Sequence, residues 1–433
     1  MQTAPPQSSR SLHCPSSRAH LALVGLLLLP LGCRRNQFPD VPAGYHEFAY
    51  VTNGASNTVS VLDLVYLRSD RTLQAGTQPT GLAVNPQRDE VYVVNSGTPN
   101  GTGSVSVINT DSNTIVATIP VHKLPYSIDV DALGHRAYVA NSGSNSVSVI
   151  DLDLRREVAV AGTGERPVLA RISLDMRSLV VTNRGSGSVS IFSIAPYAVE
   201  KPLTLPSTSA KPRPTSGDPS PHLRAAFSGC PGATDAVILP YTTRTKVFVA
   251  CSDTSQVMAL SLADAPDPKA QQDPSLLSDH VLAMLDVGGH PIHLALKPDG
   301  GELFASNFDS GTFSEINTTT NEVGGTYPIG NKPSFAIVSN DDSTLWVSNF
   351  GSDSINLWSI DDAKAVGSVS TGHAPDALVF SADQHLLLAA DAQSSDVAVI
   401  RTADKSGSPA LFTILPAGRS PNAIVIKAMQ DKP

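Results

Sequence analysis

An all-β fold made of repeated units is predicted by three observations on the sequence. A phrase that reads roughly Tyr-Val-x-Asn, turn, Val-Ser-Val-Ile-Asp returns along the chain, and successive copies lie 42, 46, 42, 68, 56, 42 and 42 residues apart. A Gly-x-x-Pro turn precedes most copies, with its proline 16 residues ahead of the Asn. Four short β-branched runs fill each interval. A fixed period of this size with four strands per unit is typical of a β-propeller.

Each unit reads as strand, turn, strand. In one copy the four runs are "TGLAV", "EVYVVN", "GSVSVIN" and "NTIVATIPV", separated by Gly, Asn, Asp and Ser, as expected for antiparallel hairpins. Ser and Thr alternate with Val and Ile because successive side chains point to opposite faces of a sheet. A single unit could not bury both faces, so neighbouring blades have to cover them.

The position of the repeated Asn serves to align the units. It is occupied by Asn53, Asn95, Asn141, Asn183, Cys251, Asn307, Asn349 and Asp391. The two longest intervals predict insertions near 195–231 and 263–280. In the unit that contains Cys251, the proline offset falls on Asp235, so we expect Gly232 to be the turn glycine and Ala233 and Thr234 to be its variable pair.

The two ends of the chain predict how the ring closes. The last Gly-x-x-Pro, Gly418 to Pro421, is followed by one strand and no hairpin, and the first hairpin, at Ala49, has no such strand before it. We therefore expect the strand from about Asn422 to Ala428 to be the innermost strand of the first blade, which hides both sheet edges. Eight hairpins with eight such strands predict eight blades.

The N-terminal segment is expected to be an export signal, residues 1–32. Basic residues precede the apolar run Leu21 to Leu31, which is too short to span a bilayer. The run ends in "PLGC" and resembles the lipobox of bacterial lipoproteins, in which the cysteine, here Cys33, is lipidated. Residues 33–47 would then be the lipidated cysteine and a tether, and residues 48–433 one propeller domain. An ordinary cleaved signal with an incidental Cys33 is the alternative.

The composition restricts the classes of partner. A formal net charge of -9 argues against nucleic acid and against a general anionic-membrane binder, so membrane contact is expected only through the lipid anchor. After processing, Cys230 and Cys251 remain, and the propeller topology places both near one face. We predict a disulfide between them in an oxidising compartment, with two buried thiols as the alternative. No spacing supports haem attachment or a structural zinc site, and no cofactor is expected.

The repeat resembles the YVTN family of β-propeller proteins, and "YVTNGASNTVSVLDL" carries the resemblance. It covers about Phe48 to Ala428 and implies an exported or surface propeller. Rings of this family are usually seven-bladed, so seven blades is the alternative to eight. The same superfamily includes lactonase-like propellers and subunits of redox systems. By resemblance to lipoprotein sorting signals, Arg34 after the cysteine favours anchoring in the outer membrane of a bacterial cell envelope.

The candidate ligand face is the one that carries the Gly-x-x-Pro turns, because those loops surround the central channel. The variable turn positions hold more basic than acidic side chains although the chain is acidic overall. This predicts a positive potential that receives an acidic small molecule or a glycan. Solvated loop side chains are the alternative. The candidates are His122, Lys123, Arg166, His290, Lys332, His373 and Arg419.

A metal site is not expected. His290 and His293 would point to opposite faces of an extended strand, and a site from His122, His290 and His373 would require three blades to converge. No Ser, His, Asp set or Gly-x-Ser-x-Gly elbow indicates catalysis.

The sequence therefore favours a binding or scaffolding module at the cell envelope rather than an enzyme, with an envelope protein, a glycan or an acidic small molecule as its partner. Two alternatives remain open. One is a lactonase-like hydrolase with a metal at the channel mouth, and the other is an accessory subunit of a periplasmic redox system.

Overall fold

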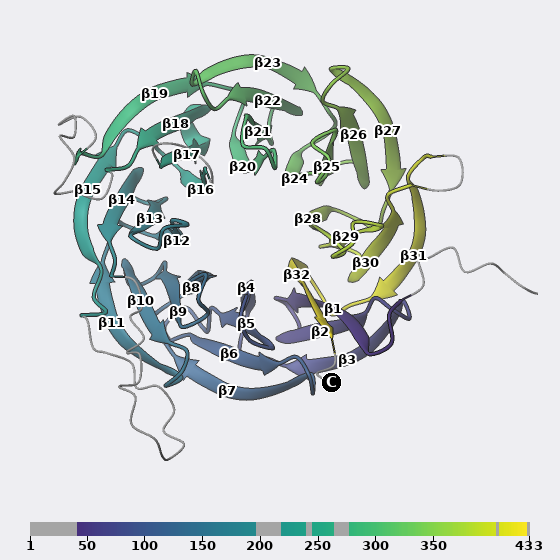
Figure 1. The fold of residues 1–433 in the computed structure, drawn as a ribbon, viewed down its shortest axis with the longest axis horizontal. Coiled ribbons are helices and arrows are strands. Elements are labelled where there is room, and N and C mark those ends of the chain that lie inside the picture. Colours follow the sequence, from purple (N-terminus) through teal and green to yellow (C-terminus); the bar gives the residue numbers. More distant parts are fainter. Residues whose placement is uncertain (1–40, 196–217, 240–244, 264–276, 404–406, 431–433) are drawn as a thin grey trace, which may run out of the picture. The chain divides into compact units, whose positions relative to one another are not determined.

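The computed structural model describes residues 41–195, 218–239, 245–263, 277–403 and 407–430. Within them the chain forms eight four-stranded antiparallel sheets arranged as the blades of one ring, shown in Figure 1. The repeat count of eight is confirmed, and the seven-bladed alternative is wrong. Among these described residues, no helix is long and apolar enough to cross a membrane. The expected signal segment, Cys33 and the first part of the tether lie outside them.

We number the blades from the one that contains the first hairpin, and give the strands of each from the channel outward. Blade 1 is β32 (Pro421–Gln430), β1 (Tyr45–Asn53), β2 (Thr58–Asp63) and β3 (Arg68–Gln74). Blade 2 is β4 (Pro79–Val84), β5 (Glu90–Asn95), β6 (Ser104–Asn109) and β7 (Thr114–Pro120). Blade 3 is β8 (Pro125–Val130), β9 (Arg136–Asn141), β10 (Ser146–Asp151) and β11 (Arg156–Gly162). Blade 4 is β12 (Pro167–Ile172), β13 (Ser178–Asn183), β14 (Ser188–Ser193) and β15 (His222–Ser228).

The remaining blades repeat the same order. Blade 5 is β16 (Ala233–Ile238), β17 (Lys246–Cys251), β18 (Gln256–Ser261) and β19 (His280–Asp286), with the short 3-10 helix η1 (Ser252–Thr254) after β17. Blade 6 is β20 (Pro291–Leu296), β21 (Glu302–Asn307), β22 (Thr312–Asn317) and β23 (Glu322–Pro328). Blade 7 is β24 (Pro333–Val338), β25 (Thr344–Asn349), β26 (Ser354–Ser359) and β27 (Lys364–Ser370). Blade 8 is β28 (Pro375–Phe380), β29 (Leu386–Asp391), β30 (Asp396–Arg401) and β31 (Ala410–Pro416).

Burial follows the position of a strand in its blade. Every residue of β5, β9 and β13 is buried, because neighbouring blades cover both faces of these strands. The outermost strands are much more exposed; in β7, for example, exposed residues alternate with residues that are partly or fully buried. The apolar core accordingly lies between blades rather than within any one of them, and stability is collective.

The repeated Asn ties the hairpin to the Gly-x-x-Pro turn. In blade 2, Asn95 pairs with Pro79 in the sheet, and its Oδ1 accepts a hydrogen bond from the Gly76 backbone N–H at 3.0 Å. Its Nδ2 donates to Ser104 Oγ at 3.2 Å and Ser106 Oγ at 2.9 Å. A Cβ on Gly76 would lie 2.7 Å from Asn95 Cγ, so glycine lets the amide pack directly against the turn. The repeated phrase is therefore a structural clasp.

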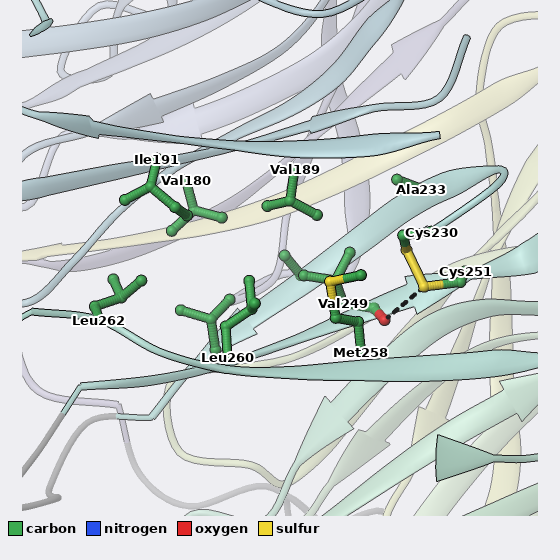
Figure 2. Close-up of a cluster of buried hydrophobic side chains, with 12 residues drawn as sticks. Val180, Val189, Ile191, Cys230, Ala233, Val249, Cys251, Met258, Leu260 and Leu262 are labelled. Atoms are coloured by element: carbon green, nitrogen blue, oxygen red, sulfur yellow. Dashed lines mark hydrogen bonds between the residues drawn. A yellow bond between two sulfur atoms is a disulfide. The ribbon is translucent and has the colours of Figure 1, made fainter. Parts of the chain in front are cut away.

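Blade 5 replaces this clasp with a covalent bond. Cys230 and Cys251 form a disulfide with a Cα–Cα distance of 4.7 Å, and both side chains are buried (Figure 2). Ala233 pairs with Cys251 here, as Pro79 pairs with Asn95 in blade 2. Cys230 therefore occupies the glycine position and Cys251 the Asn position. The expectation that Gly232 was the turn glycine is wrong by two residues, because the connection between β16 and β17 is two residues longer than usual.

The ring closes as the sequence predicts. β32 pairs antiparallel with β1, with Ala49 opposite Ile426. Across this closure Thr52 Oγ1 donates to Asn422 Oδ1 at 2.6 Å, and Asn422 Nδ2 donates to the Pro79 carbonyl of blade 2 at 3.1 Å. Figure 1 shows the C-terminal strand inside the ring beside the first hairpin. The last strand thus joins the two ends of the propeller, and it also forms a hydrogen bond with blade 2.

The two insertions fall in equivalent places. One separates β14 from β15 and the other separates β18 from β19, so each lengthens the connection between the third and fourth strands of its blade. The segment His222–Ser228, which the sequence placed inside the first insertion, is the regular outer strand β15. Residues 196–217 and 264–276, which make up most of the insertions, lie outside the described residues.

Candidate functional site

The turns at the channel mouth carry the residues that the sequence selected. Lys123, Arg166, Lys332, His373 and Arg419 are exposed, whereas His122 and His290 are half-buried. Serine side chains of the adjoining hairpins fix the backbone of these turns. Ser144 Oγ, for example, accepts from the Lys123 N–H at 2.9 Å, and Ser56 Oγ accepts from the Arg419 N–H at 3.0 Å.

Several of the candidates have local partners. His122 Nε2 lies 3.5 Å from Glu157 Oε1, and His373 Nδ1 lies 2.7 Å from Asp353 Oδ2. Arg419 donates to the Ala55 carbonyl at 3.2 Å. His122, His290 and His373 precede inner strands of blades 3, 6 and 8, so they are distributed around the mouth. Among the described residues, no group of three or more His, Cys, Asp or Glu side chains is arranged to hold a metal ion.

An aromatic cluster stands on one sector of the mouth, above blades 6 and 7. Phe308 and Phe350 directly follow the repeated Asn of their blades, and their ring centroids lie 6.2 Å apart. Lys332 Nζ lies 5.6 Å from the centre of the Phe308 ring, and His290 packs edge-on against the same ring at 6.5 Å. Two of the sequence-selected residues therefore belong to a cation–aromatic cluster.

Below the mouth, the inner strands enclose a cavity of about 510 Å³. All eight inner strands contribute to its lining, so it is the upper part of the central channel. A second cavity, of about 370 Å³, lies near the ring closure, but there Arg71 is paired with Asp70 at 2.8 Å. The channel is therefore the stronger candidate site, and the charges on its wall define what it can bind.

Blade 4 places two guanidinium groups on this wall. Arg171 lies in β12, and Arg184 directly follows β13 at the position that Phe308 holds in blade 6. Among the described residues, neither guanidinium has a carboxylate within ion-pair distance, although Arg171 is near enough to Asp129 to oppose the rise that burial causes in the pKa of that carboxyl. Two unpaired arginines on one side of a cavity form a ready site for an acidic group.

Blades 5 and 6 add a carboxylate and an imidazole whose hydrogen bonds are largely fixed. Asp235 accepts from the Ala236 N–H and the Leu294 N–H, each at 2.9 Å. His293 Nδ1 accepts from the Ala336 N–H at 3.2 Å, and its ring stacks on Phe335 with centroids 3.7 Å apart. Burial lowers the pKa of His293, although nearby Asp235 opposes the shift. Because Nδ1 accepts the Ala336 hydrogen bond, the ring N–H is on Nε2, which lies 3.9 Å from Asp235 Oδ2.

The sequence selected the mouth turns but missed Arg171, Arg184, Asp235 and His293 as a group. These residues come from consecutive blades, and each is an isolated departure from the repeat. The signal that could have found Arg171, Asp235 and His293 is a charged or ionisable side chain at an inner-strand position where other copies have apolar or small residues, such as Gly81 and Ala83. For Arg184 it is the charged residue directly after the repeated Asn, where blade 6 has Phe308. In the sequence, Asp235 stands out only because it occupies the offset of the turn proline.

Comparisons with known proteins agree with this architecture. The family model described as lactonase, 7-bladed β-propeller, matches residues 304–426, which run from β21 to β32. No curated protein matches the chain. The fold and channel thus define the class of protein as a β-propeller, and the part of the chain that matches a family model does so with a lactonase-type propeller.

The chain is also similar to solved structures over most of its length. Dihydro-heme d1 dehydrogenase NirN, solved in complex with DHE, matches 90% of this chain and 76% of its own chain, with a TM-score of 0.64 and 15% identity. A proposed 6-phosphogluconolactonase of Bacteroides uniformis matches 89% of this chain and all of its own, with a TM-score of 0.56 and 15% identity. A corresponding protein of Bacteroides fragilis has a TM-score of 0.55 and 16% identity, covering 90% of this chain and 100% of that one. Similarity at this level of identity shows the fold.

Proposed function

We propose that the protein is an exported binding module of the bacterial cell envelope that takes a small acidic molecule in its channel. The observation that carries the proposal is the pair of unpaired guanidinium groups, Arg171 and Arg184, on the wall of the 510 Å³ cavity. A carboxylate or phosphate between them would gain charge-assisted hydrogen bonds with two guanidinium groups that, among the described residues, have no carboxylate in direct ion-pair contact.

The basic turns at the mouth would act before binding. Lys123, Arg166, Lys332 and Arg419 are exposed, so the energy of each contact is small in water, but together they raise the local concentration of anions. The sequence-selected face is thus the approach to the site. The site itself lies on the channel wall below it.

Binding of caproate and inorganic phosphate by titration calorimetry tests the proposal. We expect Arg171→Gln with Arg184→Gln to weaken binding about tenfold or more, because each lost charged hydrogen bond costs about 1.5 to 3 kcal/mol. Arg166→Gln is the matched control, since it removes one exposed charge of the same kind and should change affinity less than threefold. Equal affinities for the wild type and the double variant would contradict the proposal.

Membrane anchoring through Cys33 is part of the proposed function. The "PLGC" sequence supports it, because it resembles a lipobox. Cys33→Ser should release the protein from the membrane fraction and abolish its labelling with palmitate in a bacterial host. A membrane-bound, unlabelled variant would instead indicate another mode of attachment.

Hydrolysis of a lactone is the second candidate function. The lactonase-type family match over residues 304–426 and the likeness to two proposed 6-phosphogluconolactonases favour it. Turnover of 6-phosphogluconolactone, measured with and without a chelator, tests both the activity and the metal that the lactonase-like alternative would require. The redox-accessory alternative is tested separately, by whether a haem protein or quinoprotein copurifies with the chain from its host.

A further inference from the structure

One carboxyl group on the channel wall differs from the other acidic groups near it. Asp235 and Asp129 each accept two main-chain N–H bonds, with Asp129 receiving those of Val130 and Ile172. In the described part of the chain, no main-chain N–H donates to the carboxyl of Asp376, which lies in β28. Among the described residues, its carboxyl is affected mainly by burial, which raises its pKa, and by a hydrogen bond with Ser334.

Ser334 is a weak partner for this carboxyl. A serine hydroxyl has a single proton. Ser334 Oγ also lies 3.1 Å from the Pro375 carbonyl and 3.1 Å from Ser348 Oγ, so other acceptors compete for that proton. Asp376 is therefore a half-buried carboxyl group on the cavity wall, with no cation beside it among the described residues. Its ionised form is costly to bury unless a positive partner is supplied, so a bound cation would favour that form.

The order of the blades places Asp376 across the channel from the two arginines. Contacts between inner strands run β12, β16, β20, β24, β28 on one side and β12, β8, β4, β32, β28 on the other. The strands β12 and β28 are therefore four steps apart in both directions around a ring of eight. Figure 1 shows them on opposite sides of the ring. The cavity has two guanidinium groups on one wall and an uncompensated carboxyl on the opposite wall.

We infer that the ligand of the channel is a small zwitterion whose anionic and cationic groups are separated along its length. This inference rests on the proposed function and deepens it. The anionic group lies between Arg171 and Arg184, and the ammonium or other cationic group pairs with Asp376. A ligand with only an acidic group pairs with the arginines but leaves Asp376 without a cationic partner. Asp376 therefore makes the channel prefer a zwitterion to a simple carboxylate.

A series of ω-amino acids with their deaminated twins tests this inference. The probes are γ-aminobutyrate, δ-aminovalerate and ε-aminocaproate, each compared by calorimetry with butyrate, valerate or caproate. We expect the member whose length fits the channel to bind about tenfold more tightly than its twin. In Asp376→Asn that ratio should fall to about one while the affinity for the simple carboxylate is retained.

The outcomes separate this inference from the proposed function. Carboxylates that bind through the arginines equally well with or without the amino group would overturn the zwitterion and leave the acidic-ligand site standing. No binding by either series would overturn both. A preference that persists in Asp376→Asn would assign the ammonium to another group and overturn the inference.

Asp361→Asn, an exposed substitution outside the channel lining, is the matched control, and thermal unfolding of each variant verifies folding.

Discussion

The inner strands of blades 2 and 6 have the same length and pairing but present different chemistry to the channel. β4 carries Thr80 and Gly81 at the positions where β20 carries Ile292 and His293. Both strands begin at a proline opposite the repeated Asn and shift register at the next residues. The repeat thus determines the backbone, and the departures from it determine what the channel can bind.

The contact between the Asn position and the turn glycine position also differs among blades 2, 5 and 8. Blade 2 joins Gly76 to Asn95 by a hydrogen bond, blade 5 joins two cysteines covalently, and blade 8 places Asp391 where the amide would be. Substitutions that convert one form of the clasp into another therefore measure how much each form contributes to the stability of the protein.

The largest effect is expected in blade 5. Cys230→Gly with Cys251→Asn restores the residues of a regular clasp but removes the cross-link between positions 21 residues apart. Closing a loop of about this length contributes about 3 kcal/mol, so the free energy of unfolding should fall by about that amount. Chemical denaturation measures it, with the reduced wild type as a control. An unchanged unfolding midpoint would show that the disulfide adds nothing to the clasp.

An intermediate effect, dependent on pH, is expected in blade 8. Burial raises the pKa of Asp391 to about 8, a bond from the Gly372 N–H opposes this, and nearby Asp396 adds to it. The folded protein then holds this proton to higher pH than the unfolded chain, so stability falls as pH rises from about 4 to about 8. Asp391→Asn should flatten the dependence of the melting temperature on pH in this window.

The reciprocal substitution serves as the control for Asp391. Asn141→Asp in blade 3 introduces a carboxyl at a fully buried Asn position and should create a similar fall in stability with rising pH. If the wild type and Asp391→Asn show the same pH profile, Asp391 titrates normally and the interpretation is wrong.

The smallest effect on stability is expected in blade 2. Gly76→Ala brings a methyl group against Asn95, whereas Gly162→Ala adds one where nothing lies within 4 Å. Because His122 occupies the corresponding glycine position in blade 3, the turn can accept a side chain, and we expect a loss of about 1 kcal/mol for Gly76→Ala. For Gly162→Ala the change should stay within about 0.5 kcal/mol. Equal melting temperatures for the two variants would show that the Gly–Asn contact is not restrictive.

The fold could be predicted well from the sequence because several separate features of each unit indicate the same structure. The repeated Asn, the turn proline and the Ser or Thr partners of that Asn all indicate one register, and the ends of the chain indicate the closing strand. The prediction failed locally at Gly232, where a connection two residues longer displaced the alignment of the turn. No regularity in spacing could reveal that Cys230 takes the glycine position.

The candidate site was harder to predict from sequence. Arg171 and Asp376 lie 205 positions apart, and only the closed ring places them on opposite walls of one cavity. Exposed charges in variable turns, such as Arg166, are easy to notice in a sequence. Whether an arginine has a partner depends on contacts between blades, which the spacing of the repeats does not encode.

The location of a bound acid tests the central claim most directly. Crystals of the chain after Cys33, soaked with ω-bromocaproate, would show the bromine by anomalous scattering and the carboxylate in the density. We predict a carboxylate between Arg171 and Arg184 inside the channel cavity. Probe molecules found only at the mouth turns, beside Arg166, Lys332 or Arg419, with none on the wall, would contradict the account.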